Sequence, residues 1–235
     1  MAKGSDHAVD PTVAPGLTSG DPAQALLRAL DRLALVALGA LPPDPTHCPP
    51  GTQALVLVGP KGGHSWWQEI TTSPEWRDGR PDPIDRWSHR VLAALATRFV
   101  GGAIYPSDGP PYPPFQRWAH GTGRMWQSPV GLLVHADAGL WVSFRGALAV
   151  PFSVSLPASA NPCGDCAARP CLAACPASAL TSSGYDVPAC RAFLNTPAGK
   201  DCMSHGCAVR RACPIGISHA RLSRQSAYHM RQFHP

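Results

Sequence analysis

The sequence predicts an α+β protein in which a layered domain of helices and short strands precedes a small cysteine-rich module. Two observations lead to this prediction. Segments with helical spacing alternate with short apolar runs over residues 21–150. Eight of the nine cysteines then fall within 51 residues. We therefore divide the chain into a flexible tail (1–20), an α+β domain (21–155), the cysteine module (156–217) and a basic tail (218–235).

Two helices are expected to begin at the same signal, an aspartate followed by proline. The aspartate is a good capping residue, and proline is well tolerated in the first helical turn. Asp21-Pro22 predicts a helix that runs to about Gly39. Asp82-Pro83 predicts a second helix over residues 84–100, where the apolar residues keep helical spacing.

The strands are expected from short apolar runs between turn residues. Residues 53–59 form a continuous apolar run that is typical of a buried strand. Residues 103–105 predict a short strand after the second helix. Residues 131–135 and 140–150 predict two more strands, joined by a hairpin turn at residues 136–139.

Two long loops, residues 60–81 and 106–118, are rich in glycine, proline and aromatic residues. Loops of this length are often functional, and large cofactor sites are mostly apolar. Their rings are therefore candidates for the walls of a wide pocket, with filling of the core as the alternative. The candidates on these loops are Trp66, Trp67, Tyr112 and Trp118. Trp141 is a further candidate, although its spacing on a strand favours the core.

Composition limits the possible partners and compartments. Hydrophobic residues make up 44% of the chain, and the formal net charge of +5 resides in the segment from Lys200 onward. That basic segment suits an acidic or phosphate-bearing partner, or is a solvated helix face. The most apolar stretch, residues 23–41, contains charged residues and is a poor membrane span. Residues 1–20 have no continuous apolar core like that of an export signal, so we expect a cytoplasmic protein without a membrane partner.

The cysteines form two sets of four, and each set ends in Cys-Pro. In two-cluster ferredoxins, three cysteines of a set bind one [4Fe–4S] cluster and the fourth, before proline, binds the other. This rule assigns one cluster to Cys163, Cys166, Cys171 and Cys213. It assigns the other cluster to Cys175, Cys190, Cys202 and Cys207.

Zinc and disulfides are the alternatives for the eight cysteines. Two zinc ions would also use eight thiolates, but zinc does not require the two Cys-Pro pairs. Disulfides conflict with the expected reducing compartment. The spacings around Cys190 and between Cys207 and Cys213 are longer than in the common ferredoxin run, which leaves the ligand set of the second cluster open. Cys48 is expected to be a free structural cysteine.

The cysteine module, over about residues 160–216, resembles that of epoxyqueuosine reductases and cobalamin-dependent reductive dehalogenases. The shared features include the lone Cys190 in the segment DVPACRAFLN. Upstream, residues 128–151 look like a segment of the cobalamin-processing chaperone family. The matching residues there are His135, Gly139, Trp141, Phe144, Arg145 and Gly146. The resemblance implies a nitroreductase-like domain that binds cobalamin, or flavin as in relatives, followed by a bacterial-ferredoxin-like module with two clusters.

Two polar residues of the matching segment are candidates for the cofactor site. His135 ends a strand and is the candidate catalytic residue, since histidine titrates near neutral pH and could approach cobalt or donate a proton. A turn-capping role is the alternative. Arg145 is a candidate for binding a carboxylate or phosphate group, with a buried ion pair as the alternative.

These features predict an iron–sulfur redox protein. Electrons from a flavodoxin- or ferredoxin-type donor would pass through the two clusters to cobalamin, for reduction or processing of a corrinoid or for reduction of a small-molecule substrate. One alternative is a ferredoxin-type electron carrier without a second cofactor. Another is a tRNA-modifying enzyme similar to epoxyqueuosine reductase, which the basic tail favours.

Overall fold

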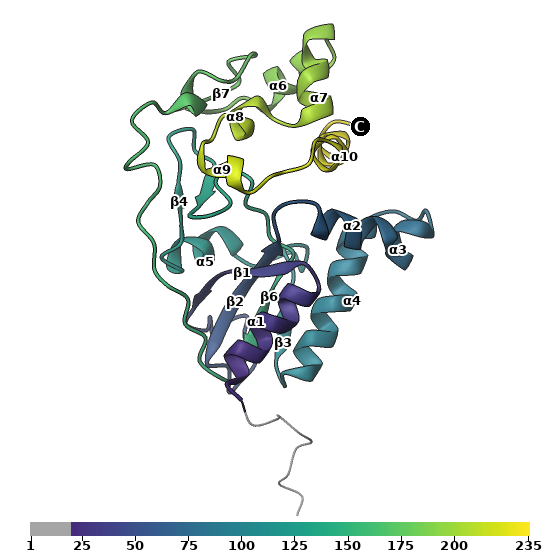
Figure 1. Ribbon diagram of the computed structural model, residues 1–235, viewed down its shortest axis with the longest axis vertical. Coiled ribbons are helices and arrows are strands. Elements are labelled where there is room, and N and C mark those ends of the chain that lie inside the picture. The colour runs from purple at the N-terminus through teal and green to yellow at the C-terminus, as the bar shows by residue number, and fades with distance from the viewer. Residues whose placement is uncertain (1–19) are drawn as a thin grey trace, which may run out of the picture.

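The computed structural model describes residues 20–235 (Figure 1). The expected flexible tail therefore lies outside the described residues, apart from Gly20. The described part of the chain mixes helices with antiparallel strands, as the sequence predicts. None of its helices is both long enough and apolar enough to cross a membrane.

A four-stranded antiparallel sheet forms the centre of the N-terminal part. Its strand order is β1-β2-β6-β3. The strands are β1 (Leu35–Leu41), β2 (Ala54–Pro60), β6 (Gly146–Val150) and β3 (Gly102–Ile104). Every residue of the two central strands, β2 and β6, is buried. This burial on both faces explains why the sequence of β2 is apolar without alternation.

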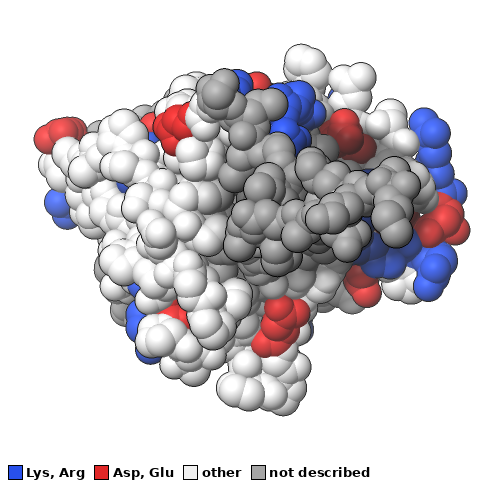
Figure 2. Space-filling model, turned by 90° about the horizontal axis from the view of Figure 1, so that it is seen from below, with Lys and Arg blue, Asp and Glu red and all other residues white. Residues whose placement is uncertain are grey.

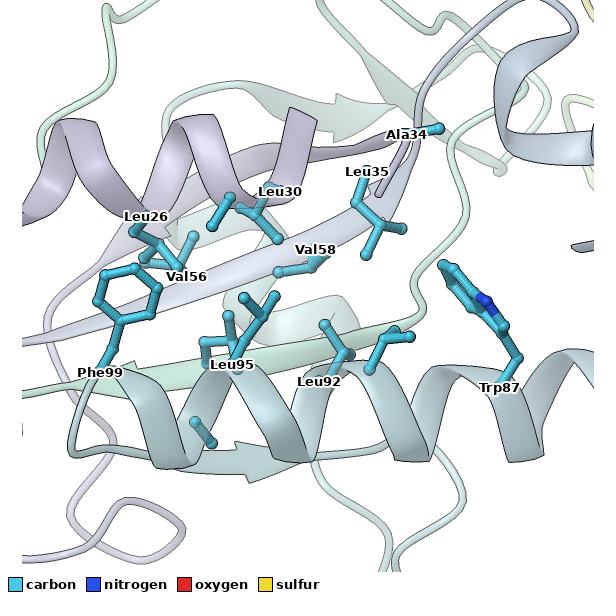
Figure 3. Close-up of a cluster of buried hydrophobic side chains, with 14 of the residues drawn as sticks. Leu26, Leu30, Ala34, Leu35, Val56, Val58, Trp87, Leu92, Leu95 and Phe99 are labelled. Atoms are coloured by element: carbon cyan, nitrogen blue, oxygen red, sulfur yellow. The ribbon is translucent and has the colours of Figure 1, made fainter. Parts of the chain in front are cut away.

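Helices cover one face of this sheet. The first core places Val56 and Val58 of β2 against α1 (Pro22–Arg32) and α4 (Pro83–Arg98), as Figure 3 shows. Trp66 and Trp67 of α2 (Ser65–Thr72) belong to the same core. The short helix α3 (Pro74–Arg77) follows α2 and packs against α4.

The other face of the sheet carries a second core. Because side chains alternate along a strand, Leu55 and Leu57 of β2 point to this face. They pack with α5 (Phe115–Gly121), with Met125 of β4 (Met125–Gln127) and with residues of the chain that follows β5. Strand β4 pairs with β5 (Leu133–His135) in a separate two-stranded sheet.

Several expected boundaries are wrong. The first helix ends at Arg32, because the chain turns at Ala34 with φ +53° and continues as β1. Pairing with β2 along the whole strand outweighs the helical propensity of this leucine- and alanine-rich segment. The expected loop 60–81 contains α2 and α3, and the expected loop 106–118 ends in α5. Only residues 146–150 of the expected strand 140–150 are a strand.

The cysteine module consists of short elements above the sheet in Figure 1. In chain order these are η1 (Pro170–Leu172), β7 (Leu180–Thr181), β8 (Gly184–Tyr185), α6 (Val187–Leu194), η2 (Pro197–Gly199), α7 (Lys200–His205), α8 (Ala208–Arg211) and α9 (Ile215–Ser218). The expected basic tail is largely the helix α10 (Ser223–Phe233), which packs on α7. Tyr228 of α10 also contacts Trp67 and Trp76, so this helix touches both parts of the chain.

A third core joins the cysteine module to the N-terminal part. It contains Val130, Val134 and Leu140 from the segment around β5. The residues that they meet in the cysteine module are Cys171, Leu180, Val209 and Cys213. The expected boundary near residue 155 therefore separates segments of the chain, but it does not separate two independent cores.

Candidate metal centres and an adjoining cavity

The first group of cysteines lines a small cavity beside the third core. Its members are Cys163, Cys166, Cys171 and Cys213. Apolar side chains, including those of Leu140 and Ile215, form the rest of the wall. Burial raises the pKa of the Cys163 and Cys171 thiols, and the neighbouring Cys213 thiol raises both further.

The second group of cysteines lines one side of a larger cavity, of about 320 Å³. Its members are Cys175, Cys190, Cys202 and Cys207. The backbone amide of Ala179 donates a hydrogen bond to Sγ of Cys175 at 3.3 Å. Burial raises the pKa of the Cys202 thiol. The two groups have the same membership as the two ligand sets expected from the cysteine spacing.

The donor atoms of both groups suit iron–sulfur clusters. Four soft thiolates are the ligand set of a [4Fe–4S] cluster, in which each thiolate binds a different iron. In the described part of the chain, no three His, Cys, Asp or Glu side chains converge closely enough to hold one metal ion. Because the pKa values of three thiols are raised, cluster binding would have to displace their protons.

The hairpin turn of residues 136–139 lies directly against the first group. His135 and Gly139 exchange two backbone hydrogen bonds of 3.0 Å, so the chain does turn here. The expected hairpin between two strands is wrong, because β5 pairs with β4 and β6 begins only at Gly146. Gly139 has φ +55°, and a Cβ atom there would lie 3.0 Å from Sγ of Cys213 and 2.6 Å from the amide nitrogen of Gly216. The close approach requires glycine at this position.

Trp141 follows this turn and fits between two loops of the cysteine module. A Cβ atom on Gly216, after the first group, would lie 2.9 Å from the indole ring. A Cβ atom on Gly206, next to Cys207 of the second group, would lie 3.1 Å from it. Trp141 therefore contacts loops of both groups, and it also lines the larger cavity.

His135 is buried, and both of its ring nitrogens have protein partners. Nδ1 accepts hydrogen bonds from the amides of Asp137 and Ala138 at 3.0 and 3.1 Å. Nε2 lies 2.8 Å from the carbonyl oxygen of Leu38 and is therefore the protonated nitrogen. Burial lowers the pKa of His135. This geometry favours the turn-capping alternative over the catalytic one.

The aromatic candidates do not gather around one pocket. Trp66 and Trp67 lie on α2 in the first core, so the expectation that they sit on an open loop is wrong. Trp118 is buried on α5, where its indole N–H donates to the carboxylate of Asp44 at 2.9 Å. Tyr112 lies on a loop and is 64% exposed. Of the five aromatic candidates, Trp141 lines the larger cavity.

Three arginines also line the larger cavity. Arg145 is a candidate from the sequence, whereas Arg210 and Arg221 belong to the segment expected to form a basic surface. The sequence signal that could have identified Arg210 is its position between Cys207 and Cys213. On the visible part of the face in Figure 2, Lys and Arg lie beside Asp and Glu around a broad uncharged area.

Comparisons with protein-family models, with curated proteins and with solved structures find no match for this chain. The function is therefore argued from the two cysteine groups and from the cavity. These features lie where the N-terminal part meets the cysteine module.

Proposed function

We propose that this protein is an iron–sulfur redox protein that passes electrons through two [4Fe–4S] clusters to a redox-active acceptor in the larger cavity. The observation that supports the proposal is that four cysteines line each of two cavities, in the division that the Cys-Pro spacing predicts. When bound, such clusters supply one-electron transfer. A flavodoxin- or ferredoxin-type protein would be the electron donor.

The residues of this chain would hold the clusters and set their surroundings. Cys171 and Cys213 are buried in the third core, which would keep water away from the first cluster. The second group faces the cavity, so a ligand there would meet the second cluster directly. Hydrogen bonding and solvent exposure around the sulfurs would then tune the two potentials differently.

The cavity fits a smaller acceptor better than cobalamin. Its volume of about 320 Å³ is at the lower end of the range of about 300–1,000 Å³ for small-molecule pockets, and cysteines of the second group occupy part of its wall. The expected corrinoid-lining residues Trp66, Trp67 and Trp118 belong to the cores. We therefore favour the flavin alternative, or a small-molecule substrate, as the acceptor.

The direct test is anaerobic reconstitution with iron and sulfide, followed by iron analysis and EPR spectroscopy. Two clusters require about eight iron atoms per chain. Cys213→Ser and Cys202→Ser should each impair a different cluster, so that their EPR spectra differ, while Cys48→Ser should leave both clusters intact. Zinc in place of iron, or equal spectra for the two variants, would contradict the proposal.

Titration of the reconstituted protein with hydroxocobalamin and with flavin then identifies the acceptor. A change in the visible spectrum with flavin alone supports the smaller acceptor. Binding of hydroxocobalamin would restore the cobalamin expectation. Binding of neither, with full iron content and rapid reduction by ferredoxin, would favour the electron carrier without a second cofactor.

The alternative of a tRNA-modifying enzyme depends on exposed basic residues. Arg210 and Arg221 line the cavity, and Arg211 forms an ion pair with Asp201. Arg224 and Arg231 of α10 are exposed. This alternative predicts tRNA binding that weakens steeply with salt and is lost in the Arg224→Glu/Arg231→Glu double variant. Unchanged binding in that variant would count against it.

A further inference from the structure

The larger cavity contains three guanidinium groups with few anionic partners. Arg145, Arg210 and Arg221 all line it, and His229 of α10 lies among them. The side chains of all three arginines are half-buried. Arginine remains protonated in proteins, so three positive charges converge on this space.

The protein itself neutralises these charges only in part. Within residues 20–235, neither Arg210 nor Arg221 forms an ion pair with a carboxylate. Arg145 lies 3.5 Å from Asp85, whose side chain is largely exposed. The Nε atoms of Arg145 and Arg221 are buried without a hydrogen-bond partner. A buried charge without such partners is costly, which indicates a ligand that supplies the missing acceptors.

Neighbouring groups hold the guanidinium groups in place. Arg210 donates to the carbonyl oxygen of Leu140 at 2.5 Å, and Arg145 donates to the hydroxyl of Ser143 at 3.1 Å. The guanidinium of Arg221 lies 5.4 Å from the ring centroid of Trp141. Burial, followed by the charges of Arg210 and Arg145, lowers the pKa of Arg221 to about 9. The three groups are therefore fixed near one another before any ligand arrives.

We propose that the arginines Arg145, Arg210 and Arg221 bind the phosphate or carboxylate group of a small anionic ligand with an apolar body. Guanidinium groups bind both oxyanions in a bidentate manner. The ring of Phe193 and the side chain of Met230 provide apolar wall for the body of the ligand. This inference rests on the proposed function and deepens it, because a ligand held here would be the electron acceptor beside the second cysteine group.

The competing explanation is that the arginines only balance the negative charge of a cluster. Arg210, three residues from Cys207, suits this role best. Arg221 discriminates between the explanations, because it lines the cavity from the loop before α10 and not from the loops that carry the second cysteine group. If charge balance were the whole explanation, Arg221→Met would shift a cluster potential, and the protein would bind no small oxyanion.

The test is calorimetric titration of the full chain with pyrophosphate and with citrate, before and after cluster reconstitution. We expect saturable binding of at least one probe, weakened tenfold or more in Arg221→Met and in Arg145→Met. The matched control is Arg224→Met, which removes the same charge from an exposed site three residues away and should change the affinity less than twofold. Pyrophosphate and citrate distinguish a phosphate-bearing from a carboxylate-bearing ligand.

A comparison of two flavins on the wild-type chain keeps the inference testable if a variant does not fold. Flavin mononucleotide and riboflavin share a ring system, but only the former carries phosphate. For a phosphate-bearing ligand we expect at least tenfold tighter binding of the mononucleotide; for a carboxylate-bearing ligand we expect citrate binding instead. Equal effects of Arg221→Met and Arg224→Met, or no binding of any of these anions, would overturn the inference. Oxyanion binding without iron uptake would support it while refuting the two-cluster function.

Discussion

Replacing Gly139 with alanine tests whether the hairpin turn supports the first cysteine group. The new Cβ would lie 2.6 Å from the amide nitrogen of Gly216 and 3.0 Å from Sγ of Cys213. The left-handed backbone conformation alone costs about 1–2 kcal/mol for alanine. Overpacking against a fixed backbone adds about 1–3 kcal/mol. The first cluster should therefore be lost or distorted, because Cys213 has to move.

Gly123→Ala is the matched control, because Gly123 has φ +66° and no atom lies within 4 Å of the position that a Cβ would take. The Gly123→Ala variant has the cost of a left-handed backbone conformation at alanine, but it has no steric contact. In thermal unfolding of the reconstituted proteins, Gly139→Ala should melt roughly 3–9 °C below Gly123→Ala, at about 3 °C per kcal/mol for a chain of this size. The iron content of Gly139→Ala should fall from about eight towards four atoms per chain, as expected if one of two clusters is lost. Equal melting temperatures and equal iron contents for the two variants would refute the reasoning.

Three further predictions concern polar groups that are buried or half-buried. His135→Leu should lower the unfolding free energy by about 2–4 kcal/mol, because two amides and a carbonyl lose their partner. Electron transfer per iron-loaded molecule should stay normal. Loss of electron transfer at normal stability would restore the catalytic alternative for His135. Asp44→Asn should cost about 1–3 kcal/mol in denaturant unfolding, since the carboxylate accepts hydrogen bonds from Trp118 and Arg117, and a neutral effect would contradict the role of this carboxylate. Burial lowers the pKa of His219 to about 4 and of His229 to about 3. The free energy of unfolding should therefore be greatest above pH 6.5, because both histidines are neutral there in the folded and the unfolded chain. It should fall towards pH 4 by at most about 1.4 kcal/mol per pH unit for each histidine, because the unfolded chain binds more protons. The denaturation midpoint of His229→Gln should depend less on pH than that of the wild type, and identical pH profiles would exclude this histidine as a source.

The sequence predicts helices and strands correctly where local signals and tertiary packing favour the same structure. Asp21-Pro22 and Asp82-Pro83 do begin α1 and α4, although the side chain of Asp21 caps its helix and that of Asp82 does not. The apolar run at residues 53–59 is the central strand β2 (Ala54–Pro60). The end of α1 was mispredicted, because leucine and alanine suit both a helix and a strand. Only the pairing of β1 with β2, across the Pro-rich turn that separates them, decides between these structures.

The candidate site was predictable to the extent that it depends on spacing. Cys-Pro spacing was enough to divide the eight cysteines into the two groups that line separate cavities. Arg145 is a candidate from the sequence, but Arg210 and Arg221 are not, because a basic segment looks the same in sequence whether it faces solvent or a cavity. Arg221 lines the cavity and Arg224 is exposed only because α10 folds back onto α7.

The third core has a consequence for the degradation of the protein in the cell. Cys171 and Cys213 are packed with Val130, Val134 and Leu140, so the cysteine ligands and the hairpin region share one apolar interior. If the thiols hold a cluster, its binding energy also stabilises the fold of residues outside the cysteine module. Chains made during iron starvation would then expose this interior to proteases. The amount of protein would then follow the supply of iron–sulfur clusters.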